Sequence, residues 1–405
     1  MLNNIELFAG AGGLLDGFEQ TGKYNLLGAV EWLQPQAKTL INRLEKKYND
    51  KNAEKKVLNF DIQRTEELIK GWNDLKFGSN LGLDSLVSNA RVDIISGGPP
   101  CQAYSLAGRI RDKDGMSNDY RNFLFEAYLE IVKYYKPKIV VFENVEGILS
   151  AIPTGEKIID LIRKSFSDAG YEIVEDLRQY ALLDLSEFGV PQKRKRVIII
   201  GIRKDNLKID YQTILKNIYL DGFNKYKVKS VKTVSDAIGD LPEIYPDKEP
   251  KGKKSHISNN NINGHYSRFH SSRDQQIFYR LAKDIADGTG LYNNAKDLID
   301  LYYDMTGKHT NVHKYHVLRL DKPSNTIPAH LKKDGLRHIH PDAAQKRSIT
   351  VREAARLQTF DDDFEFNESM GASFEMIGNA VPPLFAKILG ELVAQLYTDL
   401  LELEK

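Results

Sequence analysis

The chain has 405 residues, a formal net charge of +1 at pH 7, 41% hydrophobic residues and 28% charged residues. This length allows about two or three domains with large cores, and the balanced charge excludes a globally basic protein, so any nucleic-acid-binding surface must be local. The single cysteine excludes an internal disulfide framework and a cysteine-rich zinc site. The sequence shows neither a secretory leader nor an apolar stretch of about 20 residues, so we expect a cytoplasmic protein without a membrane partner.

A strand, a glycine turn and a helix are predicted at the start of the chain. Ile5–Phe8 is a short apolar run, and residues 10–13 read Gly-Ala-Gly-Gly. Such glycines let the backbone approach a ligand and present amides at a helix N-terminus, as in nucleotide-binding α/β units. The turn is not a phosphate-binding P-loop, because no Gly-Lys-Ser/Thr follows. A tight turn without a ligand is the alternative.

Two further strands are predicted to end in acidic residues. Leu26–Val30 runs into Glu31, which lies about 20 positions beyond the glycine turn, as suits a carboxylate that binds ribose hydroxyls. Val57–Phe60 runs into Asp61, which either caps the following helix or contacts the ligand.

The only cysteine follows a predicted buried strand. Val92, Ile94 and Ile95 precede a Gly-Gly-Pro-Pro stop, and Cys101 comes directly after it. At the carboxyl end of a strand in an α/β sheet, a thiol is well placed to be a nucleophile. The alternative is a small buried hydrophobic residue. The polar segment 108–116 reads as a surface loop that could offer basic groups to a phosphate backbone.

A second pair of candidate groups lies farther along the chain. The strand predicted over 138–142 ends in Glu143, on the same sheet edge as Cys101. Before the next strand, over 197–201, the alternation of residues places Arg194 and Arg196 on one side. These arginines favour contacts with an anion or a polar base, and a solvated basic face is the alternative.

The pattern of strands degrades beyond residue 203, which predicts a domain boundary there. Residues 248–273 contain six Lys or Arg against one acid, with interleaved histidines and aromatics, and indicate a nucleic-acid face or a flexible basic linker. The spaced residues His309, His313 and His316 are read as polar loop residues rather than metal ligands. An amphipathic helix is predicted over 350–360, with Thr350 as its N-cap, and a long helix after 378–383.

The motifs of the chain, taken together, resemble those of the DNA cytosine-C5 methyltransferases. They occur in the family's order along the chain, and only about 204–315 is unmatched. The motifs are FAGAGG (8–13), EW (31–32), DI (61–62), PPCQ (99–102), ENV (143–145), QKRKR (192–196), RLDKPSNTI (319–327), TVREAARLQTF (350–360) and GNAVPP (378–383).

The resemblance implies a covalent mechanism. Cys101 would add as a thiolate to cytosine C6, while Glu143 hydrogen-bonds N3 and the exocyclic amine. Arg194 would hold the base's O2, with Arg196 as a supporting contact. A methyl group passes from S-adenosylmethionine to C5, leaving S-adenosylhomocysteine, and loss of the C5 proton then expels Cys101. The base must be flipped out of the duplex to be reached. The residues implied to contact DNA are Gln102, Ser105, Arg109, Asn144 and Gln192.

The resemblance also implies a cofactor site without a metal. Phe8 would pack on adenine, Gly10 and Gly12 would contact the methionine end, Glu31 would bind the ribose, and Trp32 would also belong to the cofactor site. The remaining implied contacts are Asp61, Ile62, Pro100, Asn379 and Val381.

The implied fold is α/β, a Rossmann-like S-adenosylmethionine-dependent methyltransferase sheet that is mixed and mostly parallel. We expect this catalytic domain over 1–203 and 372–405, with a smaller target-recognition domain over 204–371 facing it across a DNA cleft. The variable segment 204–315 should carry sequence readout.

The expected function is sequence-specific methylation of double-stranded DNA by a monomer, in a restriction-modification system whose cognate endonuclease acts separately. Two alternatives are transfer-RNA cytosine-C5 methylation and a non-catalytic DNA-binding regulator. The long recognition-type segment argues against the first alternative, and the presence of Cys101 and Glu143 argues against the second.

Overall fold

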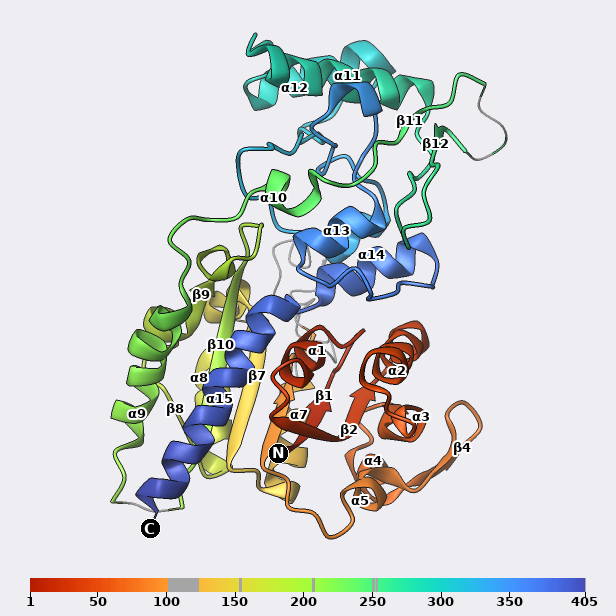
Figure 1. Ribbon diagram of the computed structural model, residues 1–405. Coiled ribbons are helices and arrows are strands. Elements are labelled where there is room, and N and C mark those ends of the chain that lie inside the picture. The colour runs from red at the N-terminus through yellow and green to blue at the C-terminus, as the bar shows by residue number, and fades with distance from the viewer. Residues whose placement is uncertain (101–123, 153–154, 206–207, 250–251, 253, 405) are drawn as a thin grey trace. The chain divides into compact units, whose positions relative to one another are not determined.

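The computed structural model describes the chain except for residues 101–123, 153–154, 206–207, 250–251, 253 and 405 (Figure 1). The described residues form two compact units. The first unit comprises Met1–Phe188, Arg194–Lys229 and Val381–Lys405, and the second comprises Gly189–Lys193 and Ser230–Ala380.

The first unit is built on one eight-stranded sheet in the order β3-β2-β1-β6-β7-β10-β8, with β9 also paired to β10. The pairs from β3 to β7 are parallel, and β10 is antiparallel to β7, β8 and β9. This confirms the predicted mixed, mostly parallel sheet. The strands are β1 (Leu2–Leu7), β2 (Tyr24–Glu31), β3 (Val57–Asn59), β6 (Ile94–Gly97), β7 (Ile139–Val145), β8 (Tyr171–Ile173), β9 (Leu182–Asp184) and β10 (Lys195–Arg203).

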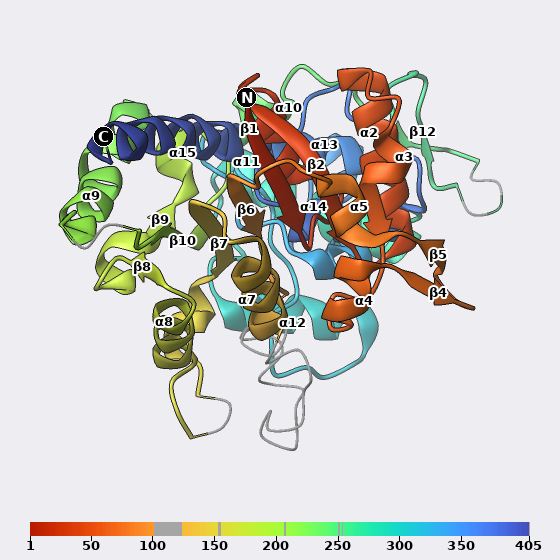
Figure 2. The ribbon, with the colours of Figure 1, turned by 90° about the horizontal axis from the view of Figure 1, so that it is seen from below.

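Helices cover both faces of this sheet. Figures 1 and 2 show α1, α2 and α15 on one face and α7 and α8 on the other. The Tyr128 hydroxyl of α7 donates to the backbone oxygens of Ile95 and Val141, at 3.1 Å each. The helices are α1 (Gly13–Glu19), α2 (Gln34–Tyr48), α3 (Ala53–Lys56), α4 (Thr65–Lys70), α5 (Gly82–Val87), α7 (Leu124–Tyr135), α8 (Ile158–Asp168), α9 (Tyr211–Asn217) and α15 (Pro383–Leu403).

The long C-terminal helix α15 packs tightly on α1. A Cβ added to Gly17 would lie 2.3 Å from the Cβ of Ala386, so the two helix backbones approach closely only because this residue is glycine. Within the described part of the chain, Met370–Leu403 is the one stretch that is long and apolar enough to cross a membrane. Its most apolar window is 78% buried inside the protein, which accounts for its apolar character.

The structure divides the chain after residues 229 and 380, whereas the sequence predicted boundaries at 203 and 371. The segment after β10 stays with the first unit because it packs on that strand. The Tyr219 hydroxyl donates to the Ile198 oxygen at 2.8 Å and accepts from the Ile200 amide at 3.0 Å. Phe223 stacks on Phe385 of α15, with ring centroids 5.9 Å apart. Composition did not reveal these contacts.

The second unit has little sheet and is built from short elements. One apolar cluster joins α11 and α12 to Tyr315, Val317 and Ile339. The Thr350 cap is confirmed, because its hydroxyl accepts from the Glu353 amide while the Glu353 carboxylate accepts from the Thr350 amide. The elements are α10 (Val234–Ile238), β11 (Tyr245–Pro246), β12 (His256–Ile257), α11 (Ser272–Asp287), α12 (Ala295–Thr306), α13 (Val351–Leu357) and α14 (Met370–Asn379).

The second unit also contains a polar interior. Arg347 and Glu353 are both about 1% exposed and form a two-pronged ion pair, with both nitrogen–oxygen distances 2.7 Å. All nine histidines of the chain lie between residues 256 and 340. Burial lowers the pKa of His270 and of His338 to about 3, and the pKa of His340 to about 4.

The sequence placed a basic and aromatic face over 248–273, and the structure corrects part of this prediction. Three histidines of the stretch, at 256, 265 and 270, are buried. Arg268 also points inward, where it donates to the backbone oxygens of Leu331 and Asp334. The side chains of the stretch that remain exposed include Lys248, Lys254, Tyr266 and Phe269.

We predict that acid affects the two units in opposite directions. A buried histidine with a lowered pKa binds its proton only after unfolding, so each should destabilise the second unit by about 2 kcal/mol between pH 7 and pH 5. In the first unit, burial raises the pKa of Glu6 to about 8 and of Glu19 to about 7, so acidification favours the folded state. Glu353, with its pKa lowered by Arg347, stays ionised throughout this range.

Differential scanning calorimetry at pH 7 and pH 5 should therefore show two transitions that separate as the pH falls. Between pH 7 and pH 5 the midpoint of the lower transition should fall less in a His338→Gln variant than in the parent, because one of the buried histidines is gone. A single transition with an unchanged midpoint at both pH values would contradict this prediction.

Candidate active site

The parallel strands bring their carboxyl ends to one edge of the sheet. β1, β2, β3, β6 and β7 all run in the same direction. The residues at or just beyond these ends therefore gather at that edge, where ligands of α/β sheets bind. They are Phe8, Glu31, Phe60, Gly98 and Glu143. Glu143 and Asn144 belong to the last three residues of β7, so the strand extends to Val145 instead of ending at Glu143 as predicted.

The glycine turn after β1 adopts left-handed backbone conformations. Phe8, Gly10 and Gly12 have φ angles of 56°, 58° and 91°. The Gly10 amide donates to Glu31 Oε2 at 2.8 Å, and a Cβ added to Gly10 would meet nothing within 4 Å. The turn thus leaves open space beside Gly10, where a ligand can approach the backbone. Gly12 instead packs inward, because an added Cβ would lie 2.5 Å from Leu40 Cδ1.

A buried ion pair anchors the helix that follows this turn. Asp16, in the first turn of α1, accepts from Arg43 Nε of α2 at 2.6 Å and from the Tyr48 hydroxyl at 2.8 Å. Asp16 and Arg43 are almost completely buried, so the pair is shielded from water. The amides at the N-terminus of α1 are therefore held in place beneath the glycine turn.

Glu31 is fixed at the end of β2. Its side chain is buried, and its second oxygen accepts from the Leu33 amide at 2.7 Å. Burial raises the pKa of this carboxyl, while hydrogen bonds from backbone amides lower it. Asn59 secures the same turn by donating to the backbone oxygens of Glu31 and Trp32 at 2.8 Å each. The next side chain, Trp32, is 44% exposed and offers a ring surface beside the carboxylate.

Asp61 does not cap the following helix. The N-cap of α4 is Arg64, so the capping interpretation is wrong. Asp61 Oδ1 instead accepts from the Gln63 amide at 3.0 Å, which forms a tight turn just after β3. Ile62 is buried behind it.

The loop after β6 is held against β7. Asn144 Nδ2 donates to the Pro99 oxygen at 3.2 Å, and a Cβ added to Gly98 would lie 2.6 Å from Glu143 Oε2. Pro99 is buried and Pro100 is exposed. The predicted residues Cys101, Gln102, Ser105 and Arg109 follow this loop and lie outside the described residues.

Glu143 lies beside two arginines. β10 pairs with β7 in a register that sets Ile198 opposite Glu143, and Arg196 Nε lies 2.8 Å from Glu143 Oε1. Arg194 is 1% exposed, and burial together with Arg196 lowers its pKa well below the usual value, against the opposing effect of Glu143. A carboxylate and two guanidinium groups can fix the edge of a polar heterocycle. Three of the four predicted catalytic residues are thus close together.

Gln192 links two segments in the interior of the second unit. It is fully buried, its amide nitrogen donates to Leu357 O and Gln358 Oε1, and its oxygen accepts from the Ile327 amide. These hydrogen bonds join the end of α13 to the segment around residue 327. Its predicted DNA contact stays a prediction. Asn379 is exposed at the end of α14 in the second unit, whereas Val381 is buried in the first.

Sequence reasoning missed residues that hold the site in place. Asn59 carries no motif, and its role depends on the parallel pairing of β2 with β3. Gly98 stood within the quoted Gly-Gly-Pro-Pro stop, but its close approach to Glu143 depends on the side-chain position. Among the described residues, no three His, Cys, Asp or Glu side chains gather where they could hold a metal ion.

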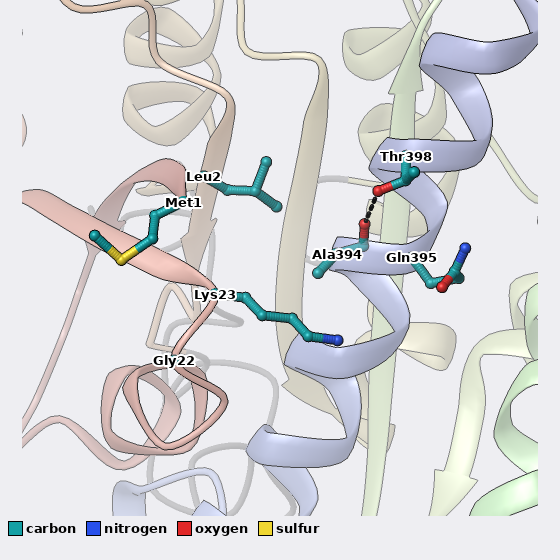
Figure 3. Close-up of a pocket in the computed structure, with 7 residues that line it drawn as sticks. All are labelled: Met1, Leu2, Gly22, Lys23, Ala394, Gln395 and Thr398. Atoms are coloured by element: carbon teal, nitrogen blue, oxygen red, sulfur yellow. Dashed lines mark hydrogen bonds between the residues drawn. The ribbon is translucent and has the colours of Figure 1, made fainter.

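A hollow of about 320 Å³ lies at the opposite edge of the sheet, where β1 and β2 begin, and α15 also lines it (Figure 3). The side chain of Lys23, in its lining, forms an ion pair with Glu391. The hollow contains none of the predicted site residues, and we assign it no function. Its lining is Met1, Leu2, Gly22, Lys23, Ala394, Gln395 and Thr398.

Solved structures with this fold include methyltransferases. A prophage-encoded protein of E. coli, named as a DNA modification methyltransferase, matches with a TM-score of 0.65 and 22% identity over 98% of this chain and 100% of that one. The S. pombe Dnmt2 methyltransferase matches with a TM-score of 0.56 and 16% identity over 99% of both chains. At these identities the likeness shows the fold alone, which is the Rossmann-like methyltransferase fold.

Sequence comparison identifies the family. The type II methyltransferase M.Bpa9945I of Bacillus paralicheniformis is 32% identical, over 96% of this chain and 98% of that relative. The type II methyltransferase M1.HphI of Haemophilus parahaemolyticus is 30% identical, over 98% of this chain and 88% of that relative. A model of the C-5 cytosine-specific DNA methylase family matches residues 2–395. The chain therefore belongs to the C-5 cytosine-specific DNA methylase family.

Proposed function

We propose that this DNA cytosine-C5 methyltransferase modifies a specific sequence in duplex DNA as part of a type II restriction-modification system. The observation that carries the proposal is the convergence, at one sheet edge, of the glycine turn with Glu31 and of Glu143 with Arg194 and Arg196. The type II methyltransferases among its relatives support the restriction-modification context. A cognate endonuclease would act separately on unmodified copies of the sequence.

The residues at the carboxyl ends of β1 to β3 fit S-adenosylmethionine. The open space at Gly10 admits a ligand beside the backbone, and the held Glu31 carboxylate can accept from ribose hydroxyls. The exposed ring of Trp32 can pack against adenine. Bound there, this cofactor supplies the methyl group. Phe8, Gly12, Asp61, Ile62, Pro100, Asn379 and Val381 would complete its contacts.

The groups around β7 would bind and activate the cytosine. In the proposed reaction the Cys101 thiolate forms a bond to C6, which makes C5 nucleophilic toward the methyl group. Glu143 binds N3 and the exocyclic amine, and Arg194 binds O2. Once C5 is methylated, its proton leaves to a base and the C6–S bond breaks, so the thiolate is regenerated. Arg196 would act by holding the Glu143 carboxylate in place.

The second unit would carry target recognition. Its exposed lysines Lys248 and Lys254 and aromatics Tyr266 and Phe269 provide charge for the phosphate backbone and apolar surface for bases. Asn144, Gln192, Gln102, Ser105 and Arg109 remain proposed DNA contacts. We propose that the protein acts as a monomer, because a single chain supplies both units.

We predict that Cys101→Ala and Glu143→Gln each lower methyl transfer to duplex DNA by at least about 100-fold, because each removes a group that acts on the reacting base. The assay measures incorporation of labelled methyl groups into DNA, with transfer RNA as the comparison substrate. Binding of S-adenosylhomocysteine should be unchanged in both variants. Covalent capture of 5-fluorocytosine DNA should occur with the parent protein and not with Cys101→Ala. Preferred methylation of transfer RNA would contradict the proposed substrate.

Gly98→Ala should lower kcat by about tenfold or more while leaving thermal stability nearly unchanged. The added methyl group would push the Glu143 carboxylate away from its position beside Arg196, and displacements of about 1 Å can cost up to about 100-fold in rate. Gly371→Ala is the matched control, since its Cβ would meet only Lys332 Cβ, at 3.9 Å. Equal activity of the two variants would show that Glu143 is not constrained by Gly98.

Lys248→Ala and Lys254→Ala should each weaken DNA binding at low salt and reduce the slope of log Kd against log salt by about one, because each removes one phosphate contact. Glu249→Gln, at a neighbouring exposed position, should strengthen binding by removing an opposing charge. Fluorescence anisotropy with labelled duplexes over a salt series measures all three. Unchanged slopes in both lysine variants would remove this segment from the DNA interface.

A further inference from the structure

An aromatic cluster lies beside the proposed cofactor site, and a small hairpin supplies half of it. The hairpin consists of β4 (Trp72–Asp74) and β5 (Gly78–Asn80), which pair antiparallel. Phe77, in its turn, meets the Trp32 ring edge-on at 6.2 Å between centroids and the Phe60 ring at 5.2 Å. Phe60 stacks on Trp72 at 3.9 Å. The hairpin thus contacts the residues that follow β2 and β3.

The turn that carries Phe77 is held by hydrogen bonds. Asp74 Oδ1 accepts from the Lys76 and Phe77 amides at 2.7 and 3.0 Å, and Asp74 Oδ2 accepts from Arg64 at 2.6 Å. The Trp72 indole donates to the Phe77 oxygen at 3.3 Å. These contacts fix the backbone of Phe77 relative to α4 and β4, and its ring contacts with Phe60 and Trp32 orient the side chain.

The hairpin also places a cation on Trp32. Lys76 Nζ lies 4.8 Å from the centroid of the Trp32 ring and 4.6 Å from that of Phe77. Leu75, between Asp74 and Lys76, is fully exposed and points away from the cluster. Residues 76 and 77 therefore act on the Trp32 ring, while residue 75 does not.

The position of Trp32 gives this contact a consequence for the cofactor. Trp32 directly follows Glu31, whose carboxylate is oriented by Gly10 and Leu33. In a nucleoside the base is bonded to the ribose, so a ribose held at Glu31 brings its base close to residue 32. The Trp32 side chain is 44% exposed, so the contacts of Phe77 and Lys76 with its ring restrict how the ring can turn.

We propose that Phe77 is a positioning residue for the methyl donor, because it holds the Trp32 ring in the orientation that packs on adenine. This inference rests on the proposed function, in which Glu31 and Trp32 bind the nucleoside part of S-adenosylmethionine. Phe77 acts through Trp32 and takes no part in methyl transfer.

The chain's own tryptophans provide the test. It has only two, Trp32 and Trp72, and both are kept in the parent because the Trp72 indole holds the Phe77 turn. Trp32 is 44% exposed and Trp72 is 7% exposed, so quenching by a solute in water reports mainly on Trp32. Titration of this full-length parent with S-adenosylhomocysteine, followed by tryptophan fluorescence, measures the Kd directly. Phe77→Ala in this background should raise the Kd between about threefold and about tenfold, as expected for loss of an aromatic pair. It should also increase quenching of Trp32 by iodide before the ligand is added.

Activity separates positioning from a general structural defect. Phe77→Ala should raise KM for S-adenosylmethionine by the same factor while kcat at saturating donor stays unchanged. Phe77→Tyr should restore the parent Kd, because it retains the ring. Leu75→Ala, two positions away in the same turn, is the matched control and should match the parent in every measurement.

Several outcomes would overturn the inference. One is a Phe77→Ala protein with the parent's thermal midpoint whose Kd is within about 1.5-fold of the parent value. If that variant fails to fold, Phe77→Leu keeps the apolar volume, and an unchanged Kd in this second variant would overturn the inference equally. If the parent methylates DNA and the Phe77 variants bind S-adenosylhomocysteine as tightly as the parent does, the inference about Phe77 is overturned and the proposed function stands. A parent that binds no S-adenosylhomocysteine overturns the proposed function and the inference together.

Discussion

The antiparallel pairing of β10 with β7 is the constraint on which the base-binding part of the site depends. The register places Ile198 opposite Glu143, so Arg196, two residues earlier, reaches the carboxylate from the neighbouring strand. A shift of this register by one residue would turn Arg196 to the other face of the sheet. Parallel pairing from β3 to β7 adds the second half of the site, because it brings the glycine turn and Glu31 to the edge where Glu143 lies.

Glycines maintain the close spacing at this edge. Gly10 leaves room beside the turn, and Gly98 leaves room for the Glu143 carboxylate. Hydrogen bonds from Asn59 and Asn144 then hold the neighbouring loops without contacting the proposed reacting groups. The described side chains of the site are therefore oriented in part by Asn59 and Gly98, which none of the motifs contains.

Local sequence patterns predicted a large part of this arrangement. Thr350 and Glu353 form the expected cap, because a capping box involves only neighbouring residues. The buried strands followed from apolar runs bounded by Gly, Pro or acidic residues. Composition could not tell which way a side chain points, so His256, His265 and His270 were assigned to a surface although they are buried, and so was Arg268, which is partly buried and bonds to backbone oxygens. Phe77 could not be predicted, because its contact with Trp32 depends on how a separate hairpin folds back.

The contact between Gly17 and Ala386 affects how the chain can be made. During synthesis the ribosome releases residues from the N-terminus onward. Helix α15, which packs on α1 in the first unit, follows residues 230–380 in the chain and is therefore made last. Helix α1 therefore lacks its packing partner until α15 has been synthesised. The inserted unit has an apolar cluster of its own whose residues all precede α15 in the chain, so the first unit, although translated first, depends on the last residues to be made.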